Sequence, residues 1–339
     1  MNAKELSQRR WDQVAKPLNS LGKLEALVVQ LAGIQNTPDV RIAKRCALIF
    51  CADHGVVAEG VSQSGCDVTA LVAKSIAEGT ANVNLMAAVS HTDVFAVDMG
   101  MLHAVPGTID RRVAAGTQNM TQASAMTRAQ AEQALQHGMD LVGEMKAKGY
   151  QLLATGEMGI GNTTAAAAMA CALLGCAPEE ITGRGAGLSD AGLMRKQDAI
   201  ARALRLHGVG SCDPIDILAR VGGLEIAGMA GAFLGGMQHG MPIIIDGVIS
   251  AVAALTAVRI CPKAAAYMLP SHMSREPAMA RIMAQLGMEP ILHADLALGE
   301  GTGAVALIPL LDMALQVYHG PHTFDDLGMA AYTPQKEQA

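Results

Sequence analysis

Short apolar runs that stop at glycine or at polar residues recur along this 339-residue chain, and this recurrence limits the possible folds most strongly. Each run has the length of a β-strand and few polar residues, which is typical of a strand buried on both faces. Helical patterns lie between the runs, as after Thr127, where Thr127 and Gln130 predict a capping box. The runs occupy residues 46–55, 92–100, 150–161, 241–247, 263–272 and 290–301.

Strands that alternate with helices predict an α/β fold with a doubly wound, mostly parallel sheet. In such a fold the ligand lies outside the carboxyl ends of the strands. The loops ADHG, GEMGIGN, IDG, PSHMS and LGEG follow the runs, so we expect them to meet at one edge of the sheet. We also expect the helical N-terminal part and the C-terminal segment to pack together as a small lobe.

The composition excludes several classes of function. The chain is 51% hydrophobic and 17% charged, so it can bury a large core. Its net charge is -6 and no block of Lys and Arg is interleaved with aromatic residues, so we expect no nucleic-acid partner. No apolar signal segment or run of about 18 apolar residues occurs, so we expect a cytoplasmic protein without membrane contact. None of the seven cysteines forms a C-x-x-C pair, so we expect neither a disulfide framework nor a zinc site.

The segment GEMGIGN is a candidate site for an anion. Glu157 precedes Gly159 and Gly161, and Asn162 begins an alanine-rich helix. Glycines let a ligand approach the backbone, and the N–H groups at a helix start favour phosphate or carboxylate. A tight turn with a helix cap explains the same pattern equally well, and only the presence of Glu157 favours a functional site.

Two further segments have both a binding and a purely structural interpretation. In GRGAG, Gly185 precedes a helix that carries Lys196, which could bind a phosphate or lie on a solvated basic face. In PSHMS, Ser274 is typical of a helix cap, and Ser271 and Ser274 could also bind phosphate. The G-x-S-x-G pattern of a hydroxyl nucleophile is missing.

The loop after the first run contains Asp53, His54, Glu59 and Asp67, which together resemble a metal set. Their spacing does not match an established carboxylate and histidine pattern. We therefore interpret this loop as one that forms hydrogen bonds around a ligand, and we expect no metal.

Glu300 lies between Gly299 and Gly301, just before a long apolar segment. A glycine-rich turn that enters a helix usually presents N–H groups to an anion, and the helix dipole favours negative ligands there. A glutamate at this place indicates that its own charge or basicity is used.

Five motifs occur in an order that is similar to one known family. They are ADHGVVAEGVS, GEMGIGNTTAAAA, DGVISAVAAL, PSHMSREPA and LGEGTGA, and the N-terminal KPLNSLGKLEALVVQLAGI also resembles that family's opening. The family is the bacterial nicotinate-nucleotide:dimethylbenzimidazole phosphoribosyltransferases, and the likeness covers nearly the whole chain. The resemblance implies a homodimer, a Rossmann-like nucleotide- and base-binding domain over residues 41–304, and a small helical lobe from residues 1–40 and about 305–339.

The resemblance also implies a reaction. Phosphoribose moves from nicotinate mononucleotide to a ring nitrogen of 5,6-dimethylbenzimidazole, nicotinate leaves, and α-ribazole phosphate forms for the lower ligand of cobalamin. The azole loses an N–H proton, so a carboxylate base is needed. The family assigns that base to the glutamate of LGEG, here Glu300, and Glu157 matches its second active-site carboxylate. No metal or organic cofactor is implied.

By motif position, Gly159, Lys196, Ser274 and Gly299 fall where the family binds the nucleotide and its phosphate. The remaining candidates come from the other loops at the expected sheet edge. The full set of candidate substrate-binding residues is Asp53, His54, Ser62, Cys66, Gly159, Gly161, Asn162, Gly185, Lys196, Asp246, Ser271, Ser274 and Gly299.

The chain departs from the family pattern in PLNSLG for PPGSLG, in GRGAG for GRGTG, and at two further places near the expected ligands. Ala297 stands where the family usually has an arginine that pairs with the phosphate, with Arg275 and Arg195 as candidates to replace it. Loss of such a contact weakens binding by roughly 1.5–3 kcal/mol. In the loop beside the acceptor base, residues 64–67 replace a Tyr-Pro-Gln-Glu stretch, so the acceptor is dimethylbenzimidazole, another azole, a purine or a phenol.

Two alternatives are open. A nucleotide-binding paralogue that acts only with a partner subunit would explain Ala297, but it would not need both Glu157 and Glu300. A nicotinamide-dependent dehydrogenase would explain the glycines, but the chain lacks G-x-G-x-x-G after the first strand and an acidic residue about 20 positions later.

Overall fold

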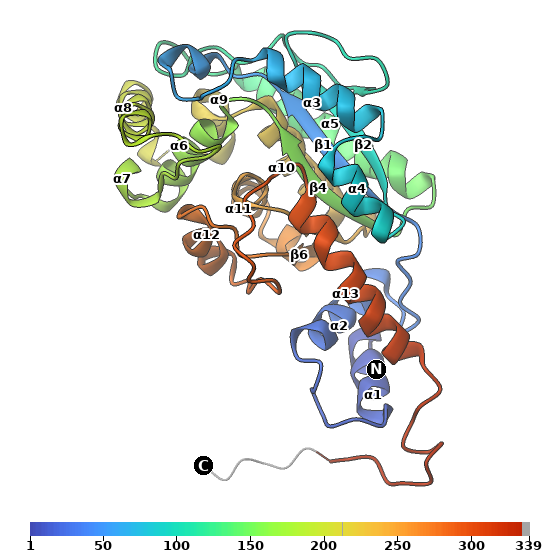
Figure 1. Ribbon diagram of the computed structural model, residues 1–339. Helices are drawn as coiled ribbons and strands as arrows, with labels where there is room; N and C mark the ends of the chain where they lie inside the picture. Colours follow the sequence, from blue (N-terminus) through green and yellow to red (C-terminus); the bar gives the residue numbers. More distant parts are fainter. Residues whose placement is uncertain (212, 334–339) are drawn as a thin grey trace, which may run out of the picture.

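The chain folds around one parallel β-sheet (Figure 1). Within residues 1–211 and 213–333, which are those that this computed structural model describes, six strands lie in the order β3-β2-β1-β4-β5-β6, and all neighbours are parallel. This order is that of Rossmann-type sheets, so the predicted doubly wound α/β fold is confirmed. The strands are β1 (Arg45–Ala52), β2 (Asp93–Gly100), β3 (Ile109–Asp110), β4 (Leu152–Met158), β5 (Ile243–Ile245) and β6 (Met268–Pro270).

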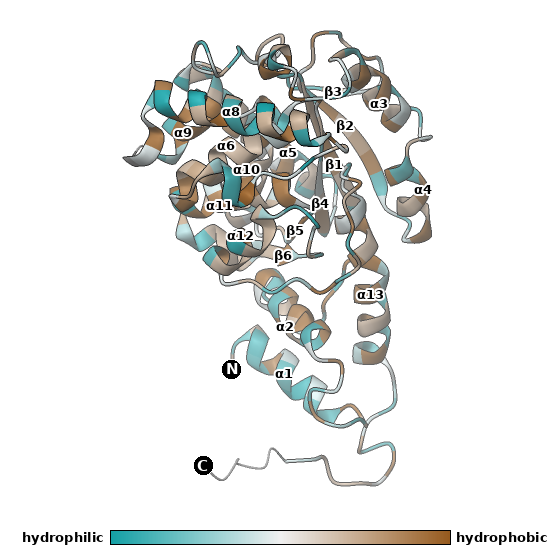
Figure 2. Ribbon diagram, turned by 60° about the vertical axis from the view of Figure 1, so that its left-hand side comes forward, coloured by the Kyte–Doolittle hydropathy of each residue, from teal (hydrophilic) through white to brown (hydrophobic). Residues whose placement is uncertain are grey.

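Helices cover both faces of the sheet, because successive side chains of a strand point to opposite faces. In β1, Ile49 belongs to one hydrophobic core, whereas Leu48 and Phe50 belong to the other. In Figure 2 the strands lie between two groups of helices. The first group is α3 (Asp67–Ala77), α4 (Asn82–Val89) and α13 (Thr302–His319), and the second is α5 (Arg128–Ala147), α6 (Asn162–Leu174), α10 (Leu224–His239) and α11 (Val248–Ile260).

The remaining helices are shorter or lie at the edges of these layers. The capping box predicted at Thr127 is confirmed, because its hydroxyl accepts from the Gln130 N–H and the Gln130 side chain accepts from the Thr127 N–H. The other helices are α1 (Ala3–Gln13), α2 (Lys23–Gln35), α7 (Pro178–Ile181), α8 (Asp190–His207), α9 (Pro214–Val221) and α12 (Ala278–Leu286), with 3₁₀ turns η1 (Gly55–Glu59), η2 (Val209–Ser211) and η3 (Pro262–Tyr267).

Two strand predictions need correction. The strand predicted over 290–301 is wrong, because only Leu292 forms an isolated bridge and the rest is irregular or turn. This segment runs beside the loop after β6, where the N–H groups of Ile291 and Leu292 both donate to the Ser271 carbonyl. Of residues 263–272, only Met268–Pro270 is strand, because Pro262 and the alanines after it form the turn η3 instead.

The first helices and the end of α13 lie at the same end of the molecule. Helices α1 and α2 lie beside the C-terminal half of α13, apart from the α/β layers (Figure 1). The rings of Trp11 and Tyr318 are 5.0 Å apart, and the Tyr318 hydroxyl donates to the Pro38 carbonyl at 2.8 Å. Residues 334–339 of the expected small lobe lie outside the described residues. In the described part of the chain, no helix is both long and apolar enough to cross a membrane.

Candidate active site

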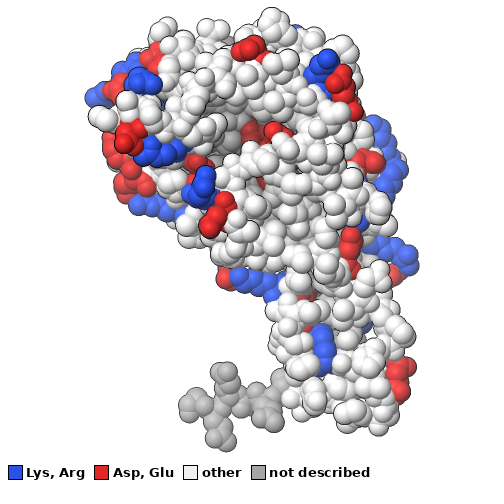
Figure 3. Space-filling view, in the orientation of Figure 1, with Lys and Arg blue, Asp and Glu red and all other residues white. Residues whose placement is uncertain are grey.

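A cavity of about 350 Å³ lies at the carboxyl ends of β4, β5 and β6. It lies near the point where the chain order reverses between β1 and β4, which is where ligands bind in sheets of this type. Figure 3 shows a hollow in the surface of the α/β part of the molecule, with acidic residues inside it. The described residues that line the cavity come from the loops after β4, β5 and β6, from Ser64 and α3, from the starts of α6 and α11, from the glycine-rich loop 183–187 and from the segment before α13.

Glu157 lies at the end of β4 and is buried in the cavity wall. Its carboxylate accepts hydrogen bonds from the Asn162 side chain and from the backbone N–H of Glu300. Burial raises the pKa of Glu157 well above the ordinary glutamate value, and the nearby charges of Asp246 and Glu225 raise it further. Both effects favour the proton-bound form of Glu157 relative to that of an exposed glutamate.

Glu300 lines the same cavity from the turn before α13. Its φ is 59°, and Gly299 and Gly301 on either side have φ values of 82° and 78°. One carboxylate oxygen, Oε2, is buried and has no hydrogen-bond partner among the described residues. Burial first, and the charge of Asp246 second, raise the pKa of Glu300. A carboxylate with a raised pKa and an unoccupied oxygen is suited to accept a proton.

Asp246 follows β5 and supports the turn that carries Glu300. Its two oxygens accept from the backbone N–H groups of Gly301, at 3.2 Å, and of Ala304, at 2.9 Å. These bonds cap the N-terminus of α13, which has no cap from its own sequence. Asp246 also lines the cavity, so this predicted substrate-binding residue has a structural role at the site as well.

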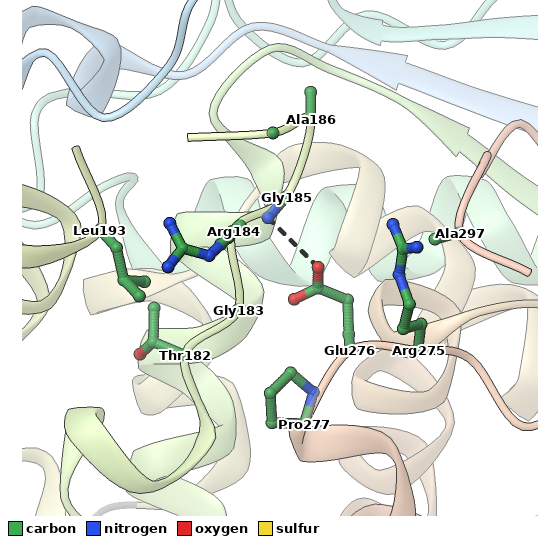
Figure 4. A pocket seen from close by; sticks show the side chains of 11 residues that line it. Thr182, Gly183, Arg184, Gly185, Ala186, Leu193, Arg275, Glu276, Pro277 and Ala297 are labelled. Carbon is green, nitrogen blue, oxygen red and sulfur yellow. Dashed lines mark hydrogen bonds between the residues drawn. The ribbon is translucent and has the colours of Figure 1, made fainter. Parts of the chain in front are cut away.

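A second cavity of about 610 Å³ adjoins the first, because Gly185, Ala186, Glu276 and Ala297 line both. Figure 4 shows Arg184 and Arg275 at its walls and the carboxylate of Glu276 between them. Glu276 accepts from the Gly185 N–H at 3.2 Å and so holds the glycine-rich loop 183–187. Among the described residues that line the second cavity, the cationic side chains are Arg184 and Arg275. The cavity is therefore suited to bind an anion.

Lys196 of α8 lies beneath this glycine-rich loop and is buried. Its Nζ donates to Thr163 Oγ1 at 2.9 Å and to the Gly183 carbonyl at 3.1 Å. Burial lowers the pKa of Lys196 to about 8, although the charge of Glu276 opposes the change. Lys196 is therefore not on a solvated basic face, and an arriving anion would stabilise its charged form.

Of the first loop, residues 53–66, Ser64 lines the cavity, whereas the predicted binding residues Asp53, His54, Ser62 and Cys66 do not. Asp53 accepts from the Leu102 N–H at 2.7 Å, and His54 Nε2 is 2.9 Å from Glu225 in a buried pair. Cys66 Sγ is 4.0 Å from the His54 carbonyl oxygen, and burial raises the pKa of its thiol. Ser62 lines a neighbouring cavity of about 70 Å³ together with Gly159, Gly161 and Asn162.

The two serines after β6 differ. Ser271 is buried and donates to the Ile245 carbonyl at 2.6 Å, so its hydroxyl is used inside the fold. Ser274 lines the main cavity, as does Gly299. The Ser274 hydroxyl accepts from the Glu276 N–H at 3.4 Å, just ahead of α12.

Sequence reasoning missed several residues that line the two cavities. His272 lies between Gly247 and Gly303, and burial lowers the pKa of its imidazole. Glu276 and Thr163 contact the glycine-rich loop and Lys196, respectively. His272 and Glu276 lie in the motif PSHMSREPA, and Thr163 lies in GEMGIGNTTAAAA. Their positions in these motifs could have indicated that they line the site. In the described chain no three His, Cys, Asp or Glu side chains are grouped as metal ligands.

Comparisons with known proteins agree with this geometry. A family model described as phosphoribosyltransferase matches residues 1–329. Nicotinate-nucleotide–dimethylbenzimidazole phosphoribosyltransferase of Acetivibrio thermocellus is 43% identical over 333 residues, which are 98% of this chain and 95% of the relative. The enzyme of the same name from Pseudomonas putida is 42% identical, over 97% of this chain and 94% of its own.

A solved structure shows the same likeness as the sequences. The crystal structure of CobT from Thermus thermophilus superposes with a TM-score of 0.90 at 40% identity, over 97% of this chain and 99% of that one. Identity at this level over whole chains establishes common descent, and not only a common fold. The chain therefore belongs to the nicotinate-nucleotide–dimethylbenzimidazole phosphoribosyltransferase family.

Proposed function

We propose that this chain transfers phosphoribose from nicotinate mononucleotide to a ring nitrogen of 5,6-dimethylbenzimidazole or a related base. The products are α-ribazole phosphate and nicotinate, which places the reaction in assembly of the lower ligand of cobalamin. The observation that carries the proposal is Glu300, a carboxylate with a raised pKa and an unpartnered oxygen, at a cavity that the glycine-rich loop 183–187 also lines. The names of the relatives support the choice of substrates.

The proposed mechanism uses the carboxylates of the cavity. The azole nitrogen attacks the anomeric carbon of the nucleotide, and the bond from that carbon to the pyridinium nitrogen breaks. Its electron pair stays with nicotinate, while the N–H proton of the azole passes to Glu300. Asp246 and Glu300 supply negative charge that stabilises the oxocarbenium character of the ribose. We assign Glu157 to hold the azole or the ribose through its favoured proton-bound form.

The acceptor is a flat heterocycle in this proposal. Apolar side chains of Val68, Val72, Val248, Ile249 and Leu298 line the cavity, which suits an aromatic ring. Ser64 from the altered loop also lines it, so this loop selects among azoles, purines and phenols. The partner-dependent paralogue is not favoured, because Glu157 and Glu300 lie on one cavity and the relatives carry an enzyme name.

A release assay tests the proposal. The purified chain is mixed with nicotinate mononucleotide and a panel of benzimidazoles, purines and phenols, and free nicotinate and the ribosylated acceptor are measured by chromatography. We expect release with dimethylbenzimidazole and a rate lower by about 10²–10⁴ in Glu300→Gln, since a general base contributes about that much. No release with any acceptor would refute the proposed activity, and unchanged release in Glu300→Gln would refute the assigned base.

We further propose a homodimer with two regions in each chain, a small helical lobe of residues 1–40 and about 305–339 and an α/β domain of residues 41–304. The contacts of Tyr318 with Trp11 and Pro38 support the grouping of the N-terminal and C-terminal parts into one helical lobe. The helices α4 and α13 pack together, and both expose apolar side chains, among them Val89 and Met313. Such apolar surface is typical of contacts between subunits.

A further inference from the structure

One cation in the second cavity has no assigned partner. Arg275 lines the cavity and is exposed to it, and in the described part of the chain its guanidinium forms no ion pair or hydrogen bond. The other cations are already engaged. Arg184 donates to the Leu188 carbonyl at 2.9 Å and pairs with Asp190, and Lys196 donates to Thr163 and Gly183.

Arg275 is held next to the methyl group of Ala297. The backbone N–H of Arg275 donates to the carbonyl of Leu296 at 3.2 Å, which fixes the two segments side by side. Figure 4 shows the guanidinium of Arg275 beside Ala297, across the cavity from the loop of Gly183 and Gly185. At position 297 itself, only a methyl group lines this wall of the cavity.

We propose that Arg275 binds the phosphate of the nucleotide donor, and that it supplies from position 275 the guanidinium that position 297 lacks. This inference rests on the proposed function and names a binding residue for that same site. A guanidinium offers two parallel N–H donors to a phosphate, which a single ammonium cannot do. Glu276 lies in the same cavity, but the Gly185 N–H and the charge of Lys196 face its carboxylate, so it does not cancel Arg275.

The first experiment measures the affinity for nicotinate mononucleotide by calorimetry in wild type, Arg275→Met and Arg275→Lys. We expect Arg275→Met to weaken binding by about 10-fold to 100-fold, the range of a charge-assisted hydrogen bond, and Arg275→Lys to weaken it less. The same variants are titrated with nicotinate riboside, which lacks the phosphate, and we expect no change there. Thermal unfolding of each variant checks that the fold is kept.

A rescue variant tests the geometry. Ala297→Arg in the Arg275→Met background returns a guanidinium to the same wall of the cavity, so we expect nucleotide binding to recover most of the loss. Arg195→Met is the control and tests the other candidate from the sequence. Arg195 is exposed, its Nε donates at 3.3 Å to the Gly60 carbonyl, and it does not line the second cavity, so the structure does not support a phosphate contact for it. We expect this control to bind the nucleotide like wild type.

The outcomes separate the two proposals. If wild type binds the nucleotide and Arg275→Met binds it equally tightly, the role of Arg275 is refuted while the proposed function stands. An equal loss of affinity for the riboside and the nucleotide would also refute a phosphate contact. If wild type does not bind the nucleotide at all, both the function and the role of Arg275 fail.

Discussion

Glu300 occupies a conformation that its residue type disfavours. A left-handed φ costs an L-residue other than glycine roughly 1–2 kcal/mol, and Glu300 has this φ between two glycines that adopt it without cost. The two hydrogen bonds from the turn and α13 to Asp246 offset this strain. A glutamate kept at such a position indicates use of its carboxylate, because glycine would satisfy the backbone better.

The raised pKa of Glu300 predicts the pH dependence of the reaction. The base works only when ionised, so the rate of nicotinate release should fall as the pH drops through a pKa above 4.5, the ordinary glutamate value. The like charge of Asp246 contributes to the rise, so Asp246→Asn should move this acidic limb to lower pH. Steady-state rates between pH 4.5 and 8 measure the limb, and an identical limb in both proteins would contradict this account.

Glu157 predicts a pH dependence of stability. Its pKa is raised in the folded chain, so between 4.5 and that raised value the folded state holds a proton that the unfolded chain has lost. The free energy of unfolding should therefore fall as the pH rises through this window. Glu157→Gln lacks the titration, so its stability relative to wild type should grow from pH 4 to pH 8. Chemical denaturation at several pH values measures this, and a constant difference would refute it.

Local sequence could predict the carboxylates at the site but not what holds them. Glu157 and Glu300 were recognisable because each stands inside a glycine-rich motif, where a carboxylate is out of place. Asp246 was predicted as a substrate ligand, yet its oxygens accept from Gly301 and Ala304, which lie more than 50 positions away. No short pattern contains such a pairing, since it arises only when β5 and α13 meet.

At the scale of elements, α5 and α10 pack closely through glycines. A Cβ on Gly231 of α10 would lie 2.0 Å from the Leu135 carbonyl oxygen of α5, and one on Gly138 would lie 2.0 Å from the Gly228 carbonyl oxygen. Both contacts are with backbone atoms, so a side chain can be accommodated only if the helices separate. The glycines therefore set the distance between the two helices.

Gly231→Ala should destabilise the fold. Overpacking costs about 1–3 kcal/mol, which exceeds the gain of about 1 kcal/mol in helix propensity from glycine to alanine. Gly33→Ala in α2 is the matched control, because the three atoms nearest to its Cβ all belong to the flexible side chain of Lys4. We expect a lower melting temperature for Gly231→Ala and an equal or higher one for Gly33→Ala. Equal melting temperatures in both variants would contradict the close packing.

The elements differ in how far sequence could predict them. The runs that became β1, β2 and β4 are long and buried, so their pattern alone was sufficient. The apolar residues of 290–301 gave a similar signal, but β6 at the sheet edge has only three residues and offers little backbone for a further strand. Strand β3 has two residues, which is too short for any pattern.

At the scale of the whole molecule, the proposed dimer can be tested on the surface of α4 and α13. Val89→Ser with Met313→Ser should weaken the association by removing apolar area, while the fold should remain because both side chains are exposed in the single chain. Analytical ultracentrifugation over a concentration series measures the dimer fraction. A dimer of unchanged affinity would place the interface elsewhere, and a wild-type monomer would refute the proposed homodimer.

Helix α13 connects the candidate active site to the helices at the N-terminus of the chain. Its 18 residues span about 27 Å, with Asp246 bound at one end beside Glu300, Arg45 bound to Asp312 in the middle at 2.8 Å, and Tyr318 packed on Trp11 at the other end. The alignment of the base thus depends on three separate supports, and the farthest belongs to the chain termini. We therefore expect a substitution of Trp11 to change the rate of nicotinate release, although Trp11 does not line the cavity.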